Sequence, residues 1–516
     1  MRADCEAVLR GEMSKEKFRE RHQAEPQPRL KPVERSQSLW RPVVVEELIA
    51  AEHPARAIWA LLGELDLSRY YRRIRALEGI AGRERTDPRV LLALWVYAYG
   101  EGVSSARELA RLCEYSPAYQ WLCGLEAINY HTLSTFRVEH KEELEQLFID
   151  LLALLSSEGL ISLESVMQDG TKIGAQAAGK SFRREQTLAV HVEAARQRVA
   201  ELSNEQQGEQ ISKKLQAARS RALRERQERL KLAQQELEKL RALKPAAEKQ
   251  EARVSLTDPE ARVMKQANGG FAASYNLQLT TTQEKIIVGV GVSQSGTDGA
   301  ELLPAMERLA ENLGAQPTQV VADGDYTNRA NIIKMTALGV DFIGPLGDRQ
   351  SQSAAKFAAR GVAREFQGQA FSYHEESDSY LCPNQKKLEY ESKDKVEGAI
   401  YYYYRAAATD CAACPYKQQC CPQNEWEGRK LMRKVEDAAV VAFREKMETE
   451  AAKQAYKRRS EVAEFPNLWL KEKMGLRKFR LRGLVKVTME ATWACLSYDV
   501  QQWIRLSWLP ALEASK

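Results

Sequence analysis

The stretch VVADGDYTNRAN, residues 320–331, begins as a short apolar strand and runs directly into two acidic residues. These acids are Asp323 and Asp325, and one glycine separates them. A short apolar run rich in β-branched residues is typical of a buried strand. Carboxylates at the end of such a strand either belong to an acidic turn or bind a divalent cation. The two interpretations differ in whether the fold brings further acidic residues to the same place.

Strand and helix patterns on both sides of this stretch predict the fold class. The expected order is strand (161–175), strand (273–282), strand (285–294), helix (299–314), strand (319–326), helix (from about residue 328) and strand (340–347). This order predicts an α/β fold with a mixed β-sheet flanked by helices. Asp298 and Glu301 have the spacing of a capping box, so Asp298 is expected to cap the helix rather than bind a metal ion.

The bulk composition is that of a folded globular protein. The chain has 516 residues, of which 44% are hydrophobic and 28% are charged, and this length suggests more than one domain. The longest apolar runs, at 90–99 and 147–155, are too short to span a membrane. The first 23 residues are charged and lack an apolar targeting segment. We therefore expect no membrane association and a cytoplasmic localisation.

The predicted domain organisation follows from changes in pattern along the chain. It comprises a flexible lead-in (1–38), a helical domain (39–159), an α/β catalytic domain (160–508) with insertions at 183–250 and 350–440, and a tail (509–516). Short helices separated by tight turns at 104–140 are typical of helix-turn-helix DNA-binding proteins, and equally of any small bundle. The 183–250 insertion has leucines at heptad spacing and a break near residues 203–208, which predicts a helical hairpin.

Five of the nine cysteines lie close together in the second insertion. They are Cys382, Cys411, Cys414, Cys420 and Cys421. In a cytosolic chain such a cluster indicates metal binding rather than disulfides. We predict a structural Zn²⁺ held by Cys382, Cys411 and Cys414 with Cys420 or Cys421 as the fourth thiolate, the alternative being unligated thiols.

Asp169 and Asp323 each close a predicted strand, and a glycine follows each of them. Neighbouring strand ends in a mixed sheet can lie side by side although they are far apart in sequence. Two carboxylates there would suit two Mg²⁺ ions, with Mn²⁺ able to substitute, which activate a nucleophile and stabilise the leaving oxygen at phosphorus. The alternative is a pair of ordinary Asp-Gly turns.

A basic segment near the end of the chain supplies groups that suit phosphate. Between residues 453 and 486 there are eleven Lys or Arg and three Glu, an excess that attracts a polyanion. On a helix Tyr456, Arg459, Glu464 and Lys471 would share one face. Further cations follow at Arg477, Lys478, Arg480 and Arg482. The alternative is a solvated basic helix in which Glu464 pairs with Lys471.

Four segments together resemble the DDE transposases of bacterial insertion sequences, in the RNase H-like (retroviral-integrase) superfamily. They are VMQDGTKIGAQA (166–177), SYNLQLTTT (274–282), VVADGDYTNRANI (320–332) and a Y-x2-R…E-x6-K pattern followed by LRKFRLRGLVKV (476–487). The resemblance covers residues 39–505 in order. It implies that Asp169, Asp323 and Glu464 form a metal-binding triad and that Tyr456, Arg459 and Lys471 contact DNA phosphates. It also implies that the helical amino-terminal domain helps to recognise the element's ends.

The sequence departs from the family pattern in three places. Asp325 is acidic where relatives usually are not, and four residues rather than three separate Arg459 from Glu464, which leaves Glu461 as an alternative third ligand. The run EFPNLWLK, residues 464–471, lacks the Phe-Gly pair of relatives. Cys420 fits the cysteine spacing of relatives better than Cys421.

The expected function is that of a cut-and-paste DNA transposase. It would hydrolyse a phosphodiester at each end of the element and transfer the 3′-hydroxyl into target DNA. Its partners would be double-stranded DNA at the nucleoid and a second copy of the chain, with the 183–250 hairpin as a candidate interface. The alternatives are a catalytically impaired DNA-binding protein derived from a transposase, and a host nuclease on the same fold.

Overall fold

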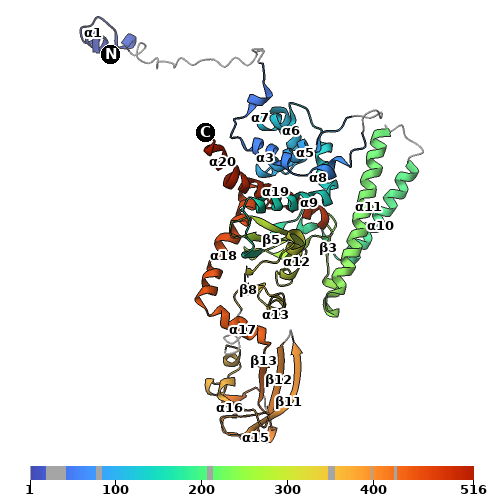
Figure 1. Ribbon diagram of the computed structural model, residues 1–516, viewed down its shortest axis with the longest axis vertical. Coiled ribbons are helices and arrows are strands. Elements are labelled where there is room, and N and C mark those ends of the chain that lie inside the picture. The colour runs from blue at the N-terminus through green and yellow to red at the C-terminus, as the bar shows by residue number, and fades with distance from the viewer. Residues whose placement is uncertain are drawn as a thin grey trace. The chain divides into compact units, whose positions relative to one another are not determined.

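The computed structural model describes residues 2–18, 42–76, 84–205, 213–346, 355–396, 399–423 and 427–515 (Figure 1). The chain divides into two compact units, Met1–Glu47 and Leu48–Lys516. The first contains helix α1 (Arg2–Leu9), and much of the predicted lead-in lies outside the described residues. No helix in the described ranges is long and apolar enough to cross a membrane.

The region that follows is helical, as predicted. Its helices are η1 (Val45–Leu48), α3 (Pro54–Glu64), α4 (Ser68–Tyr71), α5 (Pro88–Gly100), α6 (Ala106–Tyr115), α7 (Pro117–Cys123), α8 (Tyr130–Glu139) and α9 (Lys141–Ser157). Proline opens α3, α5 and α7, where its missing N–H costs no hydrogen bond. Gly124 ends α7 in the left-handed conformation that glycine adopts without strain.

The central sheet has the predicted strand and helix order and is RNase H-like. Its strands are β1 (Ser165–Gly174), β4 (Arg262–Lys265), β5 (Phe271–Thr282), β6 (Ile287–Ser293), β7 (Gln319–Ala322) and β8 (Asp341–Ile343). The order across the sheet is β4-β5-β1-β7-β8, with β6 also paired to β5. Strands β1, β7 and β8 are parallel, whereas β5 is antiparallel to β1, β4 and β6. Helices α12 (Leu302–Leu313) and α13 (Arg329–Ala337) connect the later strands.

Helix α19 (Leu484–Trp503) joins the helical region to the sheet, because it packs on α5 and α9 on one side and on β6 on another. It is buried on almost all faces, as expected for a helix inside a core. Trp493 stacks on Tyr99 with ring centroids 6.3 Å apart. One hydrophobic core therefore runs from the amino-terminal helices into the sheet. The chain then continues as the π-turn η7 (Ile504–Trp508) and helix α20 (Leu509–Ala514).

Asp499 is a fully buried carboxyl group within α19. Its Oδ1 accepts the backbone N–H of Ile287 at 2.9 Å, and its Oδ2 has no hydrogen-bond partner among the described residues. Burial raises the pKa of Asp499 well above its usual value, and the Ile287 N–H opposes this only in part. The folded chain therefore binds this proton more tightly than the unfolded chain, so stability falls as pH rises above the unfolded pKa of about 3.9.

Asp499→Asn is expected to raise the melting temperature at pH 8, because the amide keeps the bond to Ile287 and carries no charge to bury. The gain should shrink as the pH is lowered towards 5. Thermal unfolding of both proteins across this range measures it. As a control, Asp341→Asn removes an ion pair of 2.6 Å with Lys446 and should lower the melting temperature. A melting temperature at pH 8 that is unchanged or lower in Asp499→Asn would contradict the prediction.

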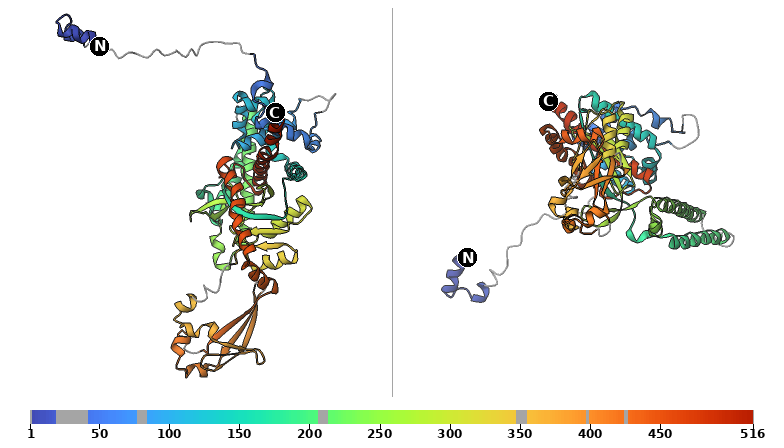
Figure 2. Two further views of the ribbon diagram at one scale, coloured as in Figure 1. Left: turned by 60° about the vertical axis from the view of Figure 1, so that its left-hand side comes forward. Right: turned by 90° about the horizontal axis from the view of Figure 1, so that it is seen from below.

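The first insertion is the predicted helical hairpin. Helices α10 (Glu185–Glu205) and α11 (Lys213–Ala242) lie side by side (Figures 1 and 2), and the short strands β2 (Phe182–Arg183) and β3 (Val254–Ser255) pair at their base, next to η2 (Gly179–Ser181) and η3 (Ala246–Glu251). Of the heptad leucines, Leu230 and Leu237 are buried in a small separate core. Part of the predicted break at 203–208 lies outside the described residues.

The second insertion contains a sheet that the sequence analysis did not predict. Its strands are β9 (Ser372–His374), β10 (Ser379–Leu381), β11 (Lys387–Val396), β12 (Ala399–Ala406) and β13 (Lys430–Val435), all antiparallel. Short helices η4 (Arg364–Phe366), η5 (Gly368–Ala370), α15 (Ala408–Ala412) and α16 (Lys417–Cys420) complete it. It has its own core around Leu388 and Tyr404. Helices α17 (Ala438–Met447) and α18 (Glu450–Leu468) and the π-turn η6 (Trp469–Lys473) lead back to α19.

Candidate active site

The register of two neighbouring parallel strands brings two of the predicted acids together. Gln168 of β1 is in register with Ala322 of β7, so Asp169 and Asp323 are the next pair along these strands. Asp169 lies in the middle of β1, so the prediction that it closes a strand is wrong, whereas Asp323 is the first residue after β7. The 154 positions between them are bridged by the sheet register, which is how a mixed sheet joins distant segments.

The contacts of Asp323 bear on whether the acidic run after β7 forms a turn or binds a cation. Its Oδ1 accepts the backbone N–H of Asp325 at 2.9 Å, so the acidic run does form a turn. Asp325 is exposed, whereas Asp323 is partly buried. Because the turn uses one oxygen of Asp323, the other oxygen remains for a ligand, and the turn and the cation interpretations are compatible.

Helix α18 packs across this end of the sheet against β1, β5 and β7. Arg459 Nη1 lies 3.3 Å from Asp169 Oδ1, and Asn467 Nδ2 donates to Asp169 Oδ2 at 2.8 Å. Asn467 occupies a position of the run that lacks the family's Phe-Gly pair, and the sequence analysis did not assign it a role. Pro466 neither ends the helix nor starts a new one, because α18 continues to Leu468 and passes into η6.

The third predicted acid is not in contact with the other two. Glu464 is exposed on α18, about 60° around the helix from Asn467, and none of the described residues forms an ion pair with it. Glu461, the alternative, pairs with Lys285 at 3.1 Å, and Lys285 lies over the ring of Phe465. The predicted alternative pairing of Glu464 with Lys471 is also absent from the described residues, since Lys471 Nζ donates to Thr171 Oγ1.

Negative charge is in excess at this site. The pKa of Asp169 is raised to about 6, mainly by burial and also by the charges of Asp323 and Asp298, while Arg459 opposes the shift. Burial also raises the pKa of Asp323, while the Asp325 N–H and Arg459 oppose it. One guanidinium thus faces several carboxylates, and this surplus of negative charge suits a bound cation.

Asp298 is not a helix cap, so that prediction is wrong. Helix α12 begins after Glu301 and has no side-chain cap. Asp298 instead accepts hydrogen bonds through Oδ1 from Asn276 Nδ2 at 2.6 Å and Gln278 Nε2 at 2.7 Å, both in β5. The missed signal lay in β5 itself. In the run SYNLQLTTT every second residue from Ser274 is polar, yet all of these side chains are buried, so that face of the strand had to find polar partners.

The basic segment after α18 runs beside the end of β1. Gly174 N donates to Arg477 O at 3.1 Å, and Phe479 N donates to Gly174 O at 2.8 Å. Phe479 is buried. Around it the four predicted DNA-binding cations Arg477, Lys478, Arg480 and Arg482 are exposed. Glu490 holds the segment by accepting the backbone N–H groups of Arg480 and Leu481. The first of these exposed cations, Arg477, therefore lies beside Gly174, which is five residues after Asp169 on β1.

The other three predicted phosphate contacts, Tyr456, Arg459 and Lys471, are only partly exposed. Tyr456 packs against a small cluster beneath α18, and the Arg459 guanidinium lies 6.0 Å from the centre of its ring. Burial lowers the pKa of Lys471, and the nearby charge of Asp169 opposes that shift. Both cations therefore lie within electrostatic reach of Asp169.

The residues present suit a metal ion in their chemistry, although in the described ranges no group of three or more His, Cys, Asp or Glu is arranged to hold one. Two carboxylates lie side by side, and the Oδ1 of the almost fully buried Asn467 has no hydrogen-bond partner among the described residues. Carboxylate and carboxamide oxygens are the ligands that hard divalent cations prefer.

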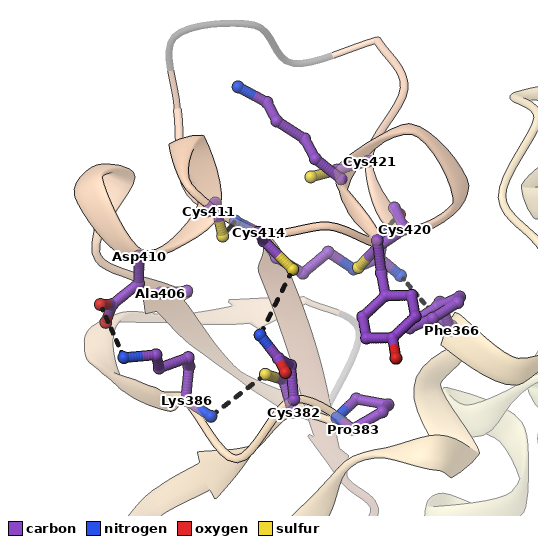
Figure 3. A pocket seen from close by; sticks show the side chains of 14 residues that line it. Phe366, Cys382, Pro383, Lys386, Ala406, Asp410, Cys411, Cys414, Cys420 and Cys421 are labelled. Atoms are coloured by element: carbon purple, nitrogen blue, oxygen red, sulfur yellow. Dashed lines mark hydrogen bonds and ion pairs between the residues drawn. The ribbon is translucent and has the colours of Figure 1, made fainter.

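The five clustered cysteines line one small pocket of about 30 Å³ in the second insertion (Figure 3). Backbone N–H groups of Lys386 and Arg429 lie 3.3 Å from the sulfurs of Cys382 and Cys411, and Asn384 Nδ2 lies 3.6 Å from that of Cys414. Burial raises the pKa of Cys420 to about 12 and also raises that of Cys421. Among the described residues, however, no three of these cysteines are arranged to hold a metal ion.

An RNase H-like sheet with carboxylates side by side on two adjacent strands, next to a run of exposed cations, is the arrangement expected of RNase H-like enzymes that act on nucleic acids. Two family models match the chain: Transposase DDE domain over residues 381–504 and Transposase domain (DUF772) over residues 43–139. No curated protein matches the chain significantly. These two matches support a DDE transposase of the insertion-sequence type, a family whose substrate is DNA.

Proposed function

We propose that this transposase cuts the ends of its element and joins the freed 3′-hydroxyl to target DNA by a cut-and-paste route. The adjacency of Asp169 in β1 and Asp323 directly after β7 carries the proposal. Asp169, Asp323 and Glu464 would hold the metal. Two Mg²⁺ ions, or Mn²⁺ in their place, supply when bound the charge that activates the attacking oxygen and stabilises the leaving one.

The chain's own residues would prepare this site in two ways. Arg459 neutralises Asp169 before DNA binds, and it would then turn to a phosphate, which frees the carboxylate. Asn467 keeps the Asp169 carboxylate oriented through its 2.8 Å hydrogen bond. Glu464 would reach the site by a change of rotamer, since it is exposed and has no ion-pair partner among the described residues.

DNA would be held mainly through its phosphates. The proposed contacts are Tyr456, Arg459, Lys471, Arg477, Lys478, Arg480 and Arg482. The helical region 39–159 would read the element's ends, while backbone contacts fix the register. Two ends must meet for transfer, so we expect a homodimer on DNA at the nucleoid, with the 183–250 hairpin as its candidate interface.

The test is to incubate purified protein with a labelled element end and Mg²⁺. We expect a nick at the end, followed by joining to a target plasmid, and neither product in the presence of a chelator. End binding without cleavage would favour a catalytically impaired DNA-binding protein. This alternative is supported by the exposed position of Glu464, which does not contact Asp169 or Asp323. Cleavage without joining would favour a nuclease. A protein that neither binds nor cleaves the labelled end would overturn the proposal.

A structural Zn²⁺ in the second insertion belongs to the same proposal, with Cys382, Cys411, Cys414 and Cys420 as ligands. It is supported by the shared pocket and by the N–H groups directed at three of the sulfurs, since such donors stabilise thiolates. We expect about one Zn²⁺ per chain by elemental analysis.

Cys411→Ser should lose this ion and lower the melting temperature, because four thiolates would no longer close the site. Cys113→Ser, at a buried cysteine of α6 outside the cluster, should keep the ion. Purified protein without zinc would refute the site. A Cys411→Ser protein that retains a full zinc content would exclude Cys411 as a ligand.

A further inference from the structure

We propose that Asp298 is an additional metal-binding carboxylate of the catalytic site, together with Asp169 and Asp323. This inference rests on the proposed function and deepens it. Nothing in the sequence pattern or in the family resemblance assigned this role to Asp298. Four observations carry the inference: how Asp298 is held, what its neighbour Gly170 permits, which charges face it, and which buried oxygens lack a partner.

Asp298 is held over the sheet next to Asp169. Its Oδ1 accepts hydrogen bonds from Asn276 and Gln278, and Gln278 is in register with Gly170 on β1. Gln278 is itself fixed, since its Oε1 accepts the hydroxyl of Tyr326 and the amide of Gln168. Because Asp298 uses one oxygen for both amides, its second oxygen is available for a ligand.

Gly170 is what allows Asp298 to come this close. A Cβ at position 170 would lie 2.5 Å from Asp298 Oδ1 and 2.9 Å from its Cγ. The backbone of Gly170 is not in a left-handed conformation, so glycine is needed here for space and not for its φ angle. The Asp169-Gly170 pair that resembled an ordinary turn therefore admits another carboxylate beside Asp169.

The charge around Asp298 lacks a counterion. Within the described part of the chain no cation forms an ion pair with Asp298, although the residue is only 8% exposed. Asp298 raises the pKa of both Asp169 and Asp323, and Arg459 is the cation that opposes both shifts. A buried carboxylate without a paired cation is costly, and a bound divalent cation would offset that cost.

Two buried amide oxygens point to the same conclusion. Asn276 is fully buried and Asn467 is 9% exposed, and in the described residues neither Oδ1 has a hydrogen-bond partner. Each belongs to an amide whose nitrogen donates to a site carboxylate, namely Asp298 for Asn276 and Asp169 for Asn467. Buried polar atoms almost always find partners, and carboxamide oxygens bind hard cations.

The test compares the wild type with Asp298→Asn, Gly170→Ala and the control Asp341→Asn. The control makes the same change on β8, at the opposite end of the sheet from the site. The first measurement is Mn²⁺ binding without DNA, by titration calorimetry of the full chain. The second is the Mg²⁺ concentration for half-maximal nicking of a labelled end.

We expect Asp298→Asn to raise the dissociation constant for Mn²⁺ and the Mg²⁺ midpoint by about tenfold or more, with end binding unchanged. Gly170→Ala should do the same, because its methyl group would crowd both Asp298 and Gln278, which holds Asp298, without removing a charge. It also serves if Asp298→Asn does not fold. Asp341→Asn should match the wild type in both measurements.

The outcomes separate this inference from the proposed function. If the wild type binds Mn²⁺ and nicks DNA while both site variants bind Mn²⁺ with wild-type affinity, Asp298 only anchors its loop and the inference fails. If the wild type neither binds Mn²⁺ nor nicks DNA, the result contradicts the proposed function itself, and not only the role of Asp298.

Discussion

Asp169→Asn and Asp323→Asn are each expected to lower Mg²⁺-dependent nicking by on the order of 10³-fold, because each removes a metal ligand that contributes several kcal/mol to the transition state. End binding should stay within about threefold of the wild type, since phosphate contacts come mainly from cations. Single-turnover nicking and a gel-shift titration in Ca²⁺ measure the two effects separately.

Misfolding is not expected to explain this loss. The amide in Asp169→Asn removes a buried charge that burial and two neighbouring carboxylates already disfavour. Only one of the two oxygens of Asp169 becomes an amide nitrogen in this variant, so one oxygen remains to accept the hydrogen bond from Asn467. The matched control is Asp325→Asn, at the exposed acid of the same turn, and it should nick at a rate within twofold of the wild type. Wild-type nicking by Asp169→Asn or Asp323→Asn would refute the metal-binding assignment.

The strands of the central sheet that the sequence predicted are those whose own residue pattern indicates that they are buried. Val320 to Ala322 is apolar because β7 is covered on both faces, and this pattern is visible without knowledge of any partner. The five-stranded sheet of the second insertion was missed for the opposite reason. Its strands β11 and β12 carry polar and tyrosine side chains of mixed exposure, so neither strand shows a clear alternation of apolar and polar residues.

The candidate site shows the same limit at the level of single residues. Asp169 and Asp323 could be found from the sequence, because each follows a run with a strand pattern, although β1 continues for five residues beyond Asp169. Asp298 and Asn467 could not, because each acquires its role through a contact with a segment more than 15 positions away. The role of Gly170 was also hidden, since the close approach of Asp298 is a property of tertiary packing.

Glu464→Gln is expected to lower nicking by about 10²- to 10³-fold, whereas Glu461→Gln should stay within twofold of the wild type. The two residues lie three positions apart on α18 but differ in what they face. Glu461 pairs with Lys285, and its loss should affect only that ion pair, which is worth at most about 1 kcal/mol when exposed. Rates of nicking under saturating Mg²⁺ measure the difference.

The contacts of Asp169 indicate why Glu464 would act only with DNA bound. Arg459 and Asn467 already occupy both oxygens of Asp169, so a third carboxylate brought there would meet a site whose charge is partly neutralised. A DNA phosphate that draws Arg459 away would leave the negative charge of Asp169 without a counterion. The metal ion would then bind there together with Glu464. If Glu461→Gln abolished nicking and Glu464→Gln did not, the third ligand would be Glu461. If neither variant lost activity, the third ligand would have to come from elsewhere, and Asp298 already lies beside both aspartates.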